Sequence, residues 1–188
     1  MDIHPELIKR CLKNERRAHH ELYRKCYGFM MAICLRYMSN KSEAESLLNQ
    51  AFLKVVTHLG KYNPDIPFGS WVNRVTINTI IDQYRREKKH REHIVEPDVA
   101  DLRSNHPVYF NLASEQFDAE QLEAMIQALP ETSRKVFNLY AIEGYTHKEI
   151  GEMLGMSDGT SKWHVSFARK KLQEMIALAM ENLKTTVL

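Results

Sequence analysis

Residues 158–172 place lysines, a hydroxyl group and aromatic rings at spacings that would gather them on one side of a helix. That side would comprise Lys162, Trp163, Ser166, Phe167 and Lys170. Because lysine can donate to guanine acceptors and aromatic rings can touch thymine methyl groups, this side could read bases in a DNA major groove. Arg169, Lys170 and Lys171 would approach phosphates. The same pattern also fits a plain helical hairpin with a solvated basic end, and spacing alone leaves both interpretations open.

Two short helices joined by a tight turn would have to position this side. Thr146 can cap a helix over residues 147–154 with Glu149 at the capping-box position, Gly155 can end it in the left-handed conformation, and Ser157 can cap the next helix. This arrangement predicts a helix-turn-helix. We expect its inner side to contain Ile150, Leu154, Val165, Ala168 and Leu172, with the small Gly151 where the helices cross.

The N-terminal half also shows helical periodicity. Apolar residues recur at spacings of three and four in ELYRKCYGFMMAICLRYM, SEAESLLNQAFLKVVTHL and SWVNRVTINTIIDQY, and no alternation typical of strands is found. Ser42, with Glu45 three residues on, predicts a capping-box start for the second of these helices, and Ser70 is expected to cap the third. The segment GKYNPDIPFG between them is expected to be a loop. The sequence therefore predicts an all-α protein.

The charge distribution suggests two modules. Residues 1–95 carry 17 Lys/Arg against 10 Asp/Glu, residues 96–120 carry 1 against 6, and residues 121–188 carry 8 against 8. The acidic stretch contains two prolines and no clear period, which is typical of a linker. We therefore predict two small helical domains, at 1–92 and 118–188, joined by a linker at 93–117, with the helix-turn-helix in the second.

Composition excludes several classes of protein. Cys11, Cys26 and Cys34 are odd in number and lack CxxC spacing, so neither a disulfide framework nor a standard zinc site is expected. The chain has no HExxH, nucleophile elbow or phosphate-binding glycine loop. The apolar run at 29–35 is too short to span a membrane, and the N-terminus lacks a signal-peptide pattern. We expect a cytoplasmic protein that is not an enzyme, with no metal, cofactor, small-molecule substrate or membrane insertion.

Residues 129–172 resemble the C-terminal promoter-reading domain of bacterial sigma factors of the extracytoplasmic-function group. The matching features are LP at 129–130, Arg134, Val136-Phe137, Glu143-Gly144, Glu149-Ile150, Leu154-Gly155, GTxK at 159–162 and ARKKL at 168–172. Residues 43–89 resemble the N-terminal domain of the same family. They match at Ala44-Glu45, Leu47, Gln50, Phe52, Phe68, Trp71, Val75, Asn78, Asp82 and Arg85-Arg86. The order of the domains and the connector also agree with the family.

The resemblance implies that the N-terminal domain binds core RNA polymerase and reads the melting minus-ten element by trapping a flipped base. Tyr62 would stack on that base and Asn78 would bond its edge, while Arg74 and Arg85 would hold the DNA backbone. Trp71 is assigned to the same surface, although a core position is the alternative. Asp82 is expected to orient a neighbouring side chain. The implied polymerase-binding residues are Leu47, Gln50 and Phe52, on a helix where Ser46 and Ala51 depart from the family pattern.

The resemblance assigns the minus-thirty-five element to the second domain. The implied contacts are Thr160, Lys162, Trp163, Ser166, Phe167, Arg169 and Lys170. The family often has Ser, Arg and Arg where this chain has Trp163, His164 and Phe167, so we predict an atypical minus-thirty-five sequence. Alternatively, Trp163 and Phe167 cover a partner surface.

The implied partners are promoter DNA, core RNA polymerase and an anti-sigma factor that occludes both domains. Two other functions fit parts of the sequence. A dimeric repressor or activator would use the helix-turn-helix, and a purely helical interaction protein would account for the amphipathic stretches.

Overall fold

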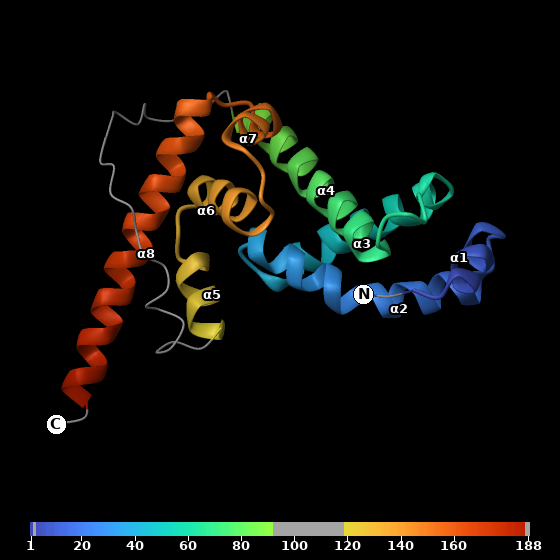
Figure 1. Ribbon diagram of the computed structural model, residues 1–188, viewed down its shortest axis with the longest axis horizontal. Coiled ribbons are helices and arrows are strands. Elements are labelled where there is room, and N and C mark those ends of the chain that lie inside the picture. Colours follow the sequence, from blue (N-terminus) through green and yellow to red (C-terminus); the bar gives the residue numbers. More distant parts are fainter. Residues whose placement is uncertain (2, 92–118, 187–188) are drawn as a thin grey trace. The chain divides into compact units, whose positions relative to one another are not determined.

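The computed structural model describes residues 1, 3–91 and 119–186, and every regular element in these ranges is helical (Figure 1). The elements are α1 (Pro5–Leu12), α2 (Arg16–Tyr37), α3 (Lys41–His58), η1 (Leu59–Lys61), α4 (Phe68–Arg91), α5 (Ala119–Gln127), α6 (Glu131–Phe137), η3 (Asn138–Ile142), α7 (His147–Leu154) and α8 (Asp158–Thr186). The prediction of an all-α fold is confirmed. The chain divides into two compact units, residues 1–91 and 92–188. The predicted linker at 93–117 lies outside the described residues.

Helices α2, α3 and α4 pack against one another to form the core of the first unit. Their predicted apolar faces are buried in the interior, because removing apolar side chains from water is the main favourable contribution to folding. The largest fully buried members are Tyr37, Leu22, Met30, Leu47, Leu48, Ile77, Ile80, Val55 and Val72. This packing fixes which sides of α3 and α4 face outward.

The predicted starts of α3 and α4 are wrong. Asn40, in extended conformation, caps α3 instead of Ser42, and its side chain accepts the Glu43 N–H at 2.9 Å. Helix α4 begins at Phe68, so Ser70 lies inside it and donates its backbone N–H to the Pro67 carbonyl at 3.0 Å. In both places the chain turns into the helix earlier than expected, because polar and proline residues upstream also favour a helix start.

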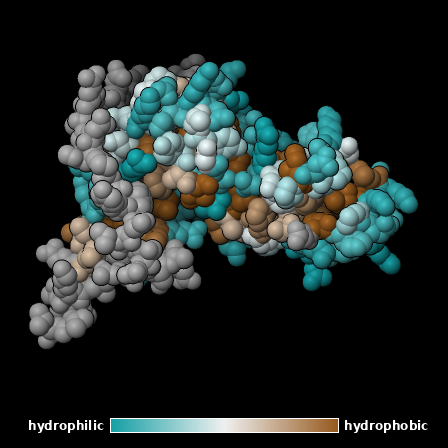
Figure 2. Space-filling model, viewed as in Figure 1, coloured by the Kyte–Doolittle hydropathy of each residue, from teal (hydrophilic) through white to brown (hydrophobic). Residues whose placement is uncertain are grey.

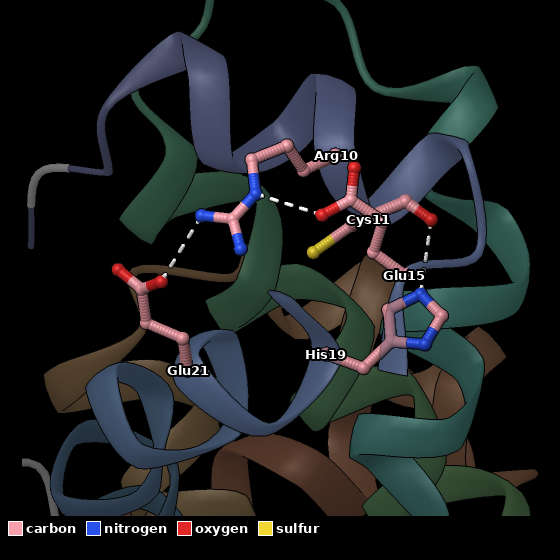
Figure 3. A network of polar contacts seen from close by, with 5 residues as sticks. All are labelled: Arg10, Cys11, Glu15, His19 and Glu21. Carbon is pink, nitrogen blue, oxygen red and sulfur yellow. Dashed lines mark hydrogen bonds and ion pairs between the residues drawn. The ribbon is translucent and has the colours of Figure 1, made fainter. Parts of the chain in front are cut away.

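Helix α1 packs against α2 and against η1. Figure 3 shows its attachment to α2 by polar contacts, in which Arg10 donates from Nε to Glu15 Oε2 at 2.9 Å and from a terminal nitrogen to Glu21 Oε2 at 3.4 Å. The ring of His19 bonds the Cys11 carbonyl at 3.0 Å. The short N-terminal helix is thus anchored beside the first turns of α2.

In the second unit, α8 packs against α6 and α7. The five residues predicted for the inner side of the helix-turn-helix are all buried. Ala168 and Leu172, however, belong to a cluster with Leu129 and Phe137, against which Met125 and Ile126 pack. The inner side of α8 therefore faces α5 and α6 as well as α7.

The predicted boundaries of the helix-turn-helix are confirmed. Thr146 and Glu149 form a reciprocal capping box at α7, and Gly155 ends that helix with φ +65°. Ser157 Oγ accepts the Thr160 N–H at 3.0 Å at the start of α8. Gly151 is required by the turn itself, because a Cβ there would lie 2.7 Å from the Met156 carbonyl oxygen.

A π-helical turn, η3, follows α6 directly and was not predicted. The Glu143 N–H donates to the Asn138 carbonyl at 3.0 Å, which is the longer bond that defines this turn. Gly144, with φ +77°, then lets the chain reverse toward α7. This segment sets where Tyr140 lies relative to the helix-turn-helix.

Figure 2 shows hydrophilic residues over much of the face in view, with hydrophobic residues visible among them. Among the described residues, no helix combines the length and apolarity that crossing a membrane requires. Cys11, Cys26 and Cys34 are free thiols buried inside the first unit. Burial raises the pKa of Cys26 and of Cys34 to about 12.

Candidate nucleic-acid interfaces

Three aromatic rings meet where the loop after α3 enters α4. Tyr62 lies edge-on to Phe68, with ring centroids 5.1 Å apart, and is tilted against Trp71 at 5.3 Å. Phe68 is buried, whereas Tyr62 and Trp71 are half-buried. The Tyr62 hydroxyl donates to the Ile66 carbonyl at 2.7 Å. Trp71 is therefore neither a core residue nor a free surface group, since it supports the ring predicted to stack on a base.

The outward face of α4 continues from this aromatic corner. Trp71, Arg74, Asn78 and Arg85 lie on the same helix, and the last three are exposed. Asn78 is two helical turns beyond Trp71, about 10 Å along the axis. Within the described part of the chain, the side chains of Arg74 and Asn78 form no hydrogen bond or ion pair. Asn78 thus presents its amide on the same face of α4 as Trp71, which contacts the Tyr62 ring.

Asp82 does not join that surface. Its carboxylate accepts a hydrogen bond from Lys54 Nζ of α3 at 2.7 Å, an ion pair in which both side chains are partly exposed. The expectation that Asp82 orients a neighbouring side chain is confirmed. The Lys54 ammonium also offsets the negative charge of Asp82. Without this pairing, the carboxylate would repel DNA phosphates that approach the exposed side of α4.

The predicted polymerase-binding residues on α3 do not form one surface. Leu47 is fully buried, so it supports the core and is not available for a partner, which corrects the prediction. Gln50 is exposed, and Phe52 is half-buried with its ring 4.9 Å from that of Tyr23. Leu53, which the sequence reasoning missed, is 66% exposed. Its spacing of three residues from Gln50 could have indicated that the two share a face.

The outward side of α8 carries a stacked aromatic pair. The rings of Trp163 and Phe167 lie 5.2 Å apart and nearly parallel, and both residues are half-buried. His164 approaches Trp163 edge-on at 4.9 Å, and its Nδ1 shares a hydrogen bond with the Ser133 hydroxyl at 2.9 Å. His164 thus faces α6, while the aromatic pair remains partly open to a ligand.

The polar residues predicted for this interface differ in accessibility. Lys162 and Lys170 are exposed, and Lys162 Nζ pairs with Asp158 Oδ2 at 2.6 Å. Thr160 is exposed but its hydroxyl bonds that of Ser157 at 2.8 Å, and Ser166 is half-buried. The Asp158 pair is exposed and therefore weak, so it holds the Lys162 ammonium in place without preventing contact with DNA.

Arg169 lies apart from the other predicted DNA contacts. Its guanidinium lies 5.6 Å from the centre of the Tyr140 ring, which in turn stacks on His147 at 4.4 Å. His147 Nδ1 and the Ser161 hydroxyl lie 3.1 Å apart, within hydrogen-bonding distance. Burial, with Lys162 and Arg169 nearby, lowers the pKa of His147. Arg169 therefore connects α8 to η3 in this structure.

A pocket of about 670 Å³ beside this connection was also missed. Its lining includes Tyr140, Ile142, Tyr145, Thr146 and Arg169. No sequence pattern predicts this pocket, because its shape depends on the π-helical turn. In the described residues, no group of three or more His, Cys, Asp or Glu side chains is placed to hold a metal ion.

The chain matches two family models. Residues 22–90 match Sigma-70 region 2, and residues 119–172 match region 4 of Sigma-70. The first range contains the aromatic corner and the α4 face, and the second contains the helix-turn-helix.

Curated relatives agree with these matches. The chain is 31% identical over 144 residues to the RNA polymerase sigma factor SigZ of Bacillus subtilis, covering 74% of this chain and 76% of that protein. It is 27% identical over 157 residues to the ECF sigma factor SigE of Mycolicibacterium smegmatis, covering 84% of this chain but only 61% of that longer protein. A solved structure of the sigma factor RpoE with the anti-sigma factor NepR from Bartonella quintana aligns over 84% of this chain and 97% of that one, with 18% identity and a TM-score of 0.48.

The chain belongs to the RNA polymerase sigma factors, and within them to the extracytoplasmic-function group, whose members are alternative sigma factors for transcription initiation. The domains of this family bind core RNA polymerase and promoter DNA.

Proposed function

We propose that this chain directs core RNA polymerase to promoters by two separate DNA surfaces, one in each unit. The observation that carries the proposal is the aromatic corner followed, two turns along α4, by the exposed Asn78 amide, which forms no hydrogen bond within the described residues. An aromatic face and a free amide together suit a base removed from its stack. The chain supplies binding energy alone, so phosphodiester chemistry belongs to the polymerase and the protein is not an enzyme. Its work on core polymerase requires a cytoplasmic location.

The first surface reads the minus-ten element. Tyr62, supported by Phe68 and Trp71, offers a ring face on which a base can stack. Asn78 can donate and accept hydrogen bonds at the base edge, and it gives up no bond to any other described residue when it does so. Arg74 and Arg85 are exposed along the same helix and neutralise the backbone.

The second surface reads the minus-thirty-five element through α8. Lys162 and Lys170 are exposed cations, and the Trp163–Phe167 pair supplies apolar contact area. Apolar contacts in the major groove favour the thymine methyl group, so we propose a preference for thymine opposite this pair. Arg169 acts indirectly, by holding α8 against η3.

Core polymerase binds to the exposed side of α3, where Gln50 and Leu53 share a face next to Phe52. Exposed apolar side chains on an otherwise polar helix face are typical of a surface that binds a partner protein. An anti-sigma protein covering the same surfaces would switch the factor off, as the family resemblance implies.

The test is run-off transcription with bacterial core polymerase on a promoter library, with and without the protein. We expect protein-dependent transcripts that Asn78→Ala and Lys162→Ala both weaken. Lys9→Ala is the matched control for Lys162→Ala, since Lys9 is also exposed and paired with a carboxylate on its own helix. Duplex binding without core polymerase, and no transcripts, would instead identify a repressor or activator.

A further inference from the structure

One half of α2 carries basic residues that nothing in the first unit uses. Arg16, Arg17, His20, Arg24 and Lys25 are all exposed and lie on the outward side of the helix, and we call them the α2 basic face. Within the described residues, none of these five side chains forms a hydrogen bond or an ion pair. Arg17 and Arg24 are seven residues apart, which places them on one line about 10 Å long.

The first turn of α2 is an unfavourable place for these charges. Arg16 and Arg17 lie at the N-terminal end, where the helix dipole is positive, and the first turn contains no acidic residue. Glu15 precedes the helix but makes no side-chain capping bond to it. The positive potential at this end is therefore left for an external anion to neutralise.

The carboxylates that could neutralise the face are held elsewhere. Arg10 of α1 binds Glu15 at 2.9 Å and Glu21 at 3.4 Å, and Figure 3 shows the guanidinium between the two. The hydrogen bond to Glu15 raises the pKa of Arg10, and a guanidinium is in any case charged near neutral pH. Arg10 holds both carboxylates and offsets one of their two negative charges. Within the described residues, Arg17 and Arg24 form no ion pair with Glu21, although they lie four and three residues from it on the same helix.

The chemistry of the face fits a phosphate backbone better than a protein. Protein interfaces have an apolar centre, whereas the line through Arg17 and Arg24 passes next through Gly28. Phe29, 36% exposed, follows Gly28 but lies about 100° further round the helix, to one side of this line. A Cβ at Gly28 would meet nothing within 4 Å, so the fold itself does not require glycine in the middle of this helix. Glycine does allow another backbone to approach closely.

The position of α2 also suits DNA. Helix α1 contacts both α2 and η1, and Met1 packs beside Gly69, so the start of α2 lies on the same side as the loop that carries Tyr62. Duplex DNA presents about six phosphate charges over about 10 Å, enough to engage both arginines.

We propose that the α2 basic face binds the DNA phosphate backbone next to the minus-ten element, as a third contact surface that carries no sequence information. This inference rests on the proposed function. The face adds affinity and salt dependence to the holoenzyme, while Asn78 and Lys162 supply selection.

The experiment measures the affinity of the holoenzyme, formed from the full chain and core polymerase, for a promoter fragment between about 50 and about 200 mM salt. We expect Arg17→Gln/Arg24→Gln to reduce the slope of log affinity against log salt by about 2, since each phosphate contact contributes about 0.9. The ratio of wild-type to variant affinity for the promoter would then be about tenfold larger at the lower salt concentration than at the higher one. Lys9→Gln/Lys41→Gln removes the same charge from exposed positions outside the face and is expected to leave the slope unchanged.

Two further variants separate the explanations. Arg17→Lys/Arg24→Lys should restore the slope, because a phosphate contact needs only the charge. Arg10→Gln should weaken binding without touching DNA, because it leaves Glu15 and Glu21 uncompensated. Trp71 fluorescence during urea unfolding, in a Trp163→Phe background, checks that the first unit of each variant is folded.

An unchanged slope in Arg17→Gln/Arg24→Gln would overturn the proposal while leaving the sigma role intact, provided that run-off transcription by the wild-type chain is observed. Loss of affinity for core polymerase, with an unchanged salt slope, would show that the face binds the enzyme instead. A wild-type holoenzyme that binds no promoter would remove the proposed function and this inference together.

Discussion

The indole of Trp163 and the phenyl ring of Phe167 stack one helical turn apart on α8, with ring centroids separated by 5.2 Å and planes inclined by 20°. Each ring limits the rotation of the other, so α8 presents an ordered apolar surface. Lys162 and Lys170 lie on either side of it in the sequence. The family resemblance would place an arginine at the position of Phe167. The aromatic pair is therefore the feature most able to change which promoter is read.

Replacing Phe167 by arginine is expected to change the preferred minus-thirty-five sequence from thymine toward guanine at the contacted base pair. The change breaks the stack with Trp163 and adds a donor for guanine, worth about 1–3 kcal/mol of discrimination. Binding-site selection with the holoenzyme measures it. Phe167→Leu, which keeps an apolar side chain, should retain the wild-type preference. Recovery of the usual family sequence by the wild-type chain would refute the assignment.

Tyr62→Ala should weaken open-complex formation by about 1–3 kcal/mol, the value of one base stacked on an aromatic ring. Tyr62→Phe should cost less, because it keeps the ring against Trp71 and removes only the hydroxyl bond to the Ile66 carbonyl. Permanganate reactivity of unpaired thymines reports the melted region. Equal losses in the two variants would mean that Tyr62 positions the loop through its hydroxyl instead of holding a base.

Gly151→Ala should destabilise the second unit by about 1–3 kcal/mol, because the new methyl group would lie 2.7 Å from the Met156 carbonyl oxygen. Gly159→Ala is the matched control, since its Cβ would meet only Ser157 Oγ at 3.6 Å. Each unit contains one of the two tryptophans, so Trp163 fluorescence in a Trp71→Phe background follows the second unit alone during urea unfolding. Similar midpoints for both variants would contradict the close contact.

The second unit should lose stability as the pH falls below 6.5. The pKa of His147 is lowered from 6.5 by burial, then by Lys162 and Arg169, while Asp158 opposes the shift. The unfolded chain therefore takes up the proton first, and stability is lost as pH falls from that value toward the folded-state pKa. Urea midpoints at about pH 7.5 and about pH 5.5, on either side of the free imidazole value, measure the loss. His147→Gln should show a smaller change over this range, and an unaltered pH dependence would assign the effect to another group.

Sequence reasoning placed the helix-turn-helix well because its boundaries are local. Thr146, Glu149, Gly155 and Ser157 determine the caps through neighbours three or four residues away, and each behaves as its residue type predicts. The role of Asp82 as the partner of a neighbouring side chain was also predictable, since a carboxylate among exposed cations attracts a positive group.

Features that depend on distant packing were not predictable in the same way. Leu47 matches the family pattern, but only the arrangement of α2, α3 and α4 reveals that it is enclosed. Arg169 is part of a basic run, yet the π-helical turn brings Tyr140 beneath it. The predicted start of α3 was wrong for a simpler reason. Asn40 and Ser42 are both favourable N-cap residues, and the helix uses the earlier one.

The enclosed cysteines of the first unit set a limit on how this factor can respond to its surroundings. Reaction with an oxidant requires a thiolate, and thiols with a pKa of about 12, as at Cys26 and Cys34, are almost wholly protonated near neutral pH. Burial raises the pKa of Cys11 as well. Direct oxidation of these three thiols is therefore disfavoured while the first unit stays folded, and an opening of its core would have to come before it.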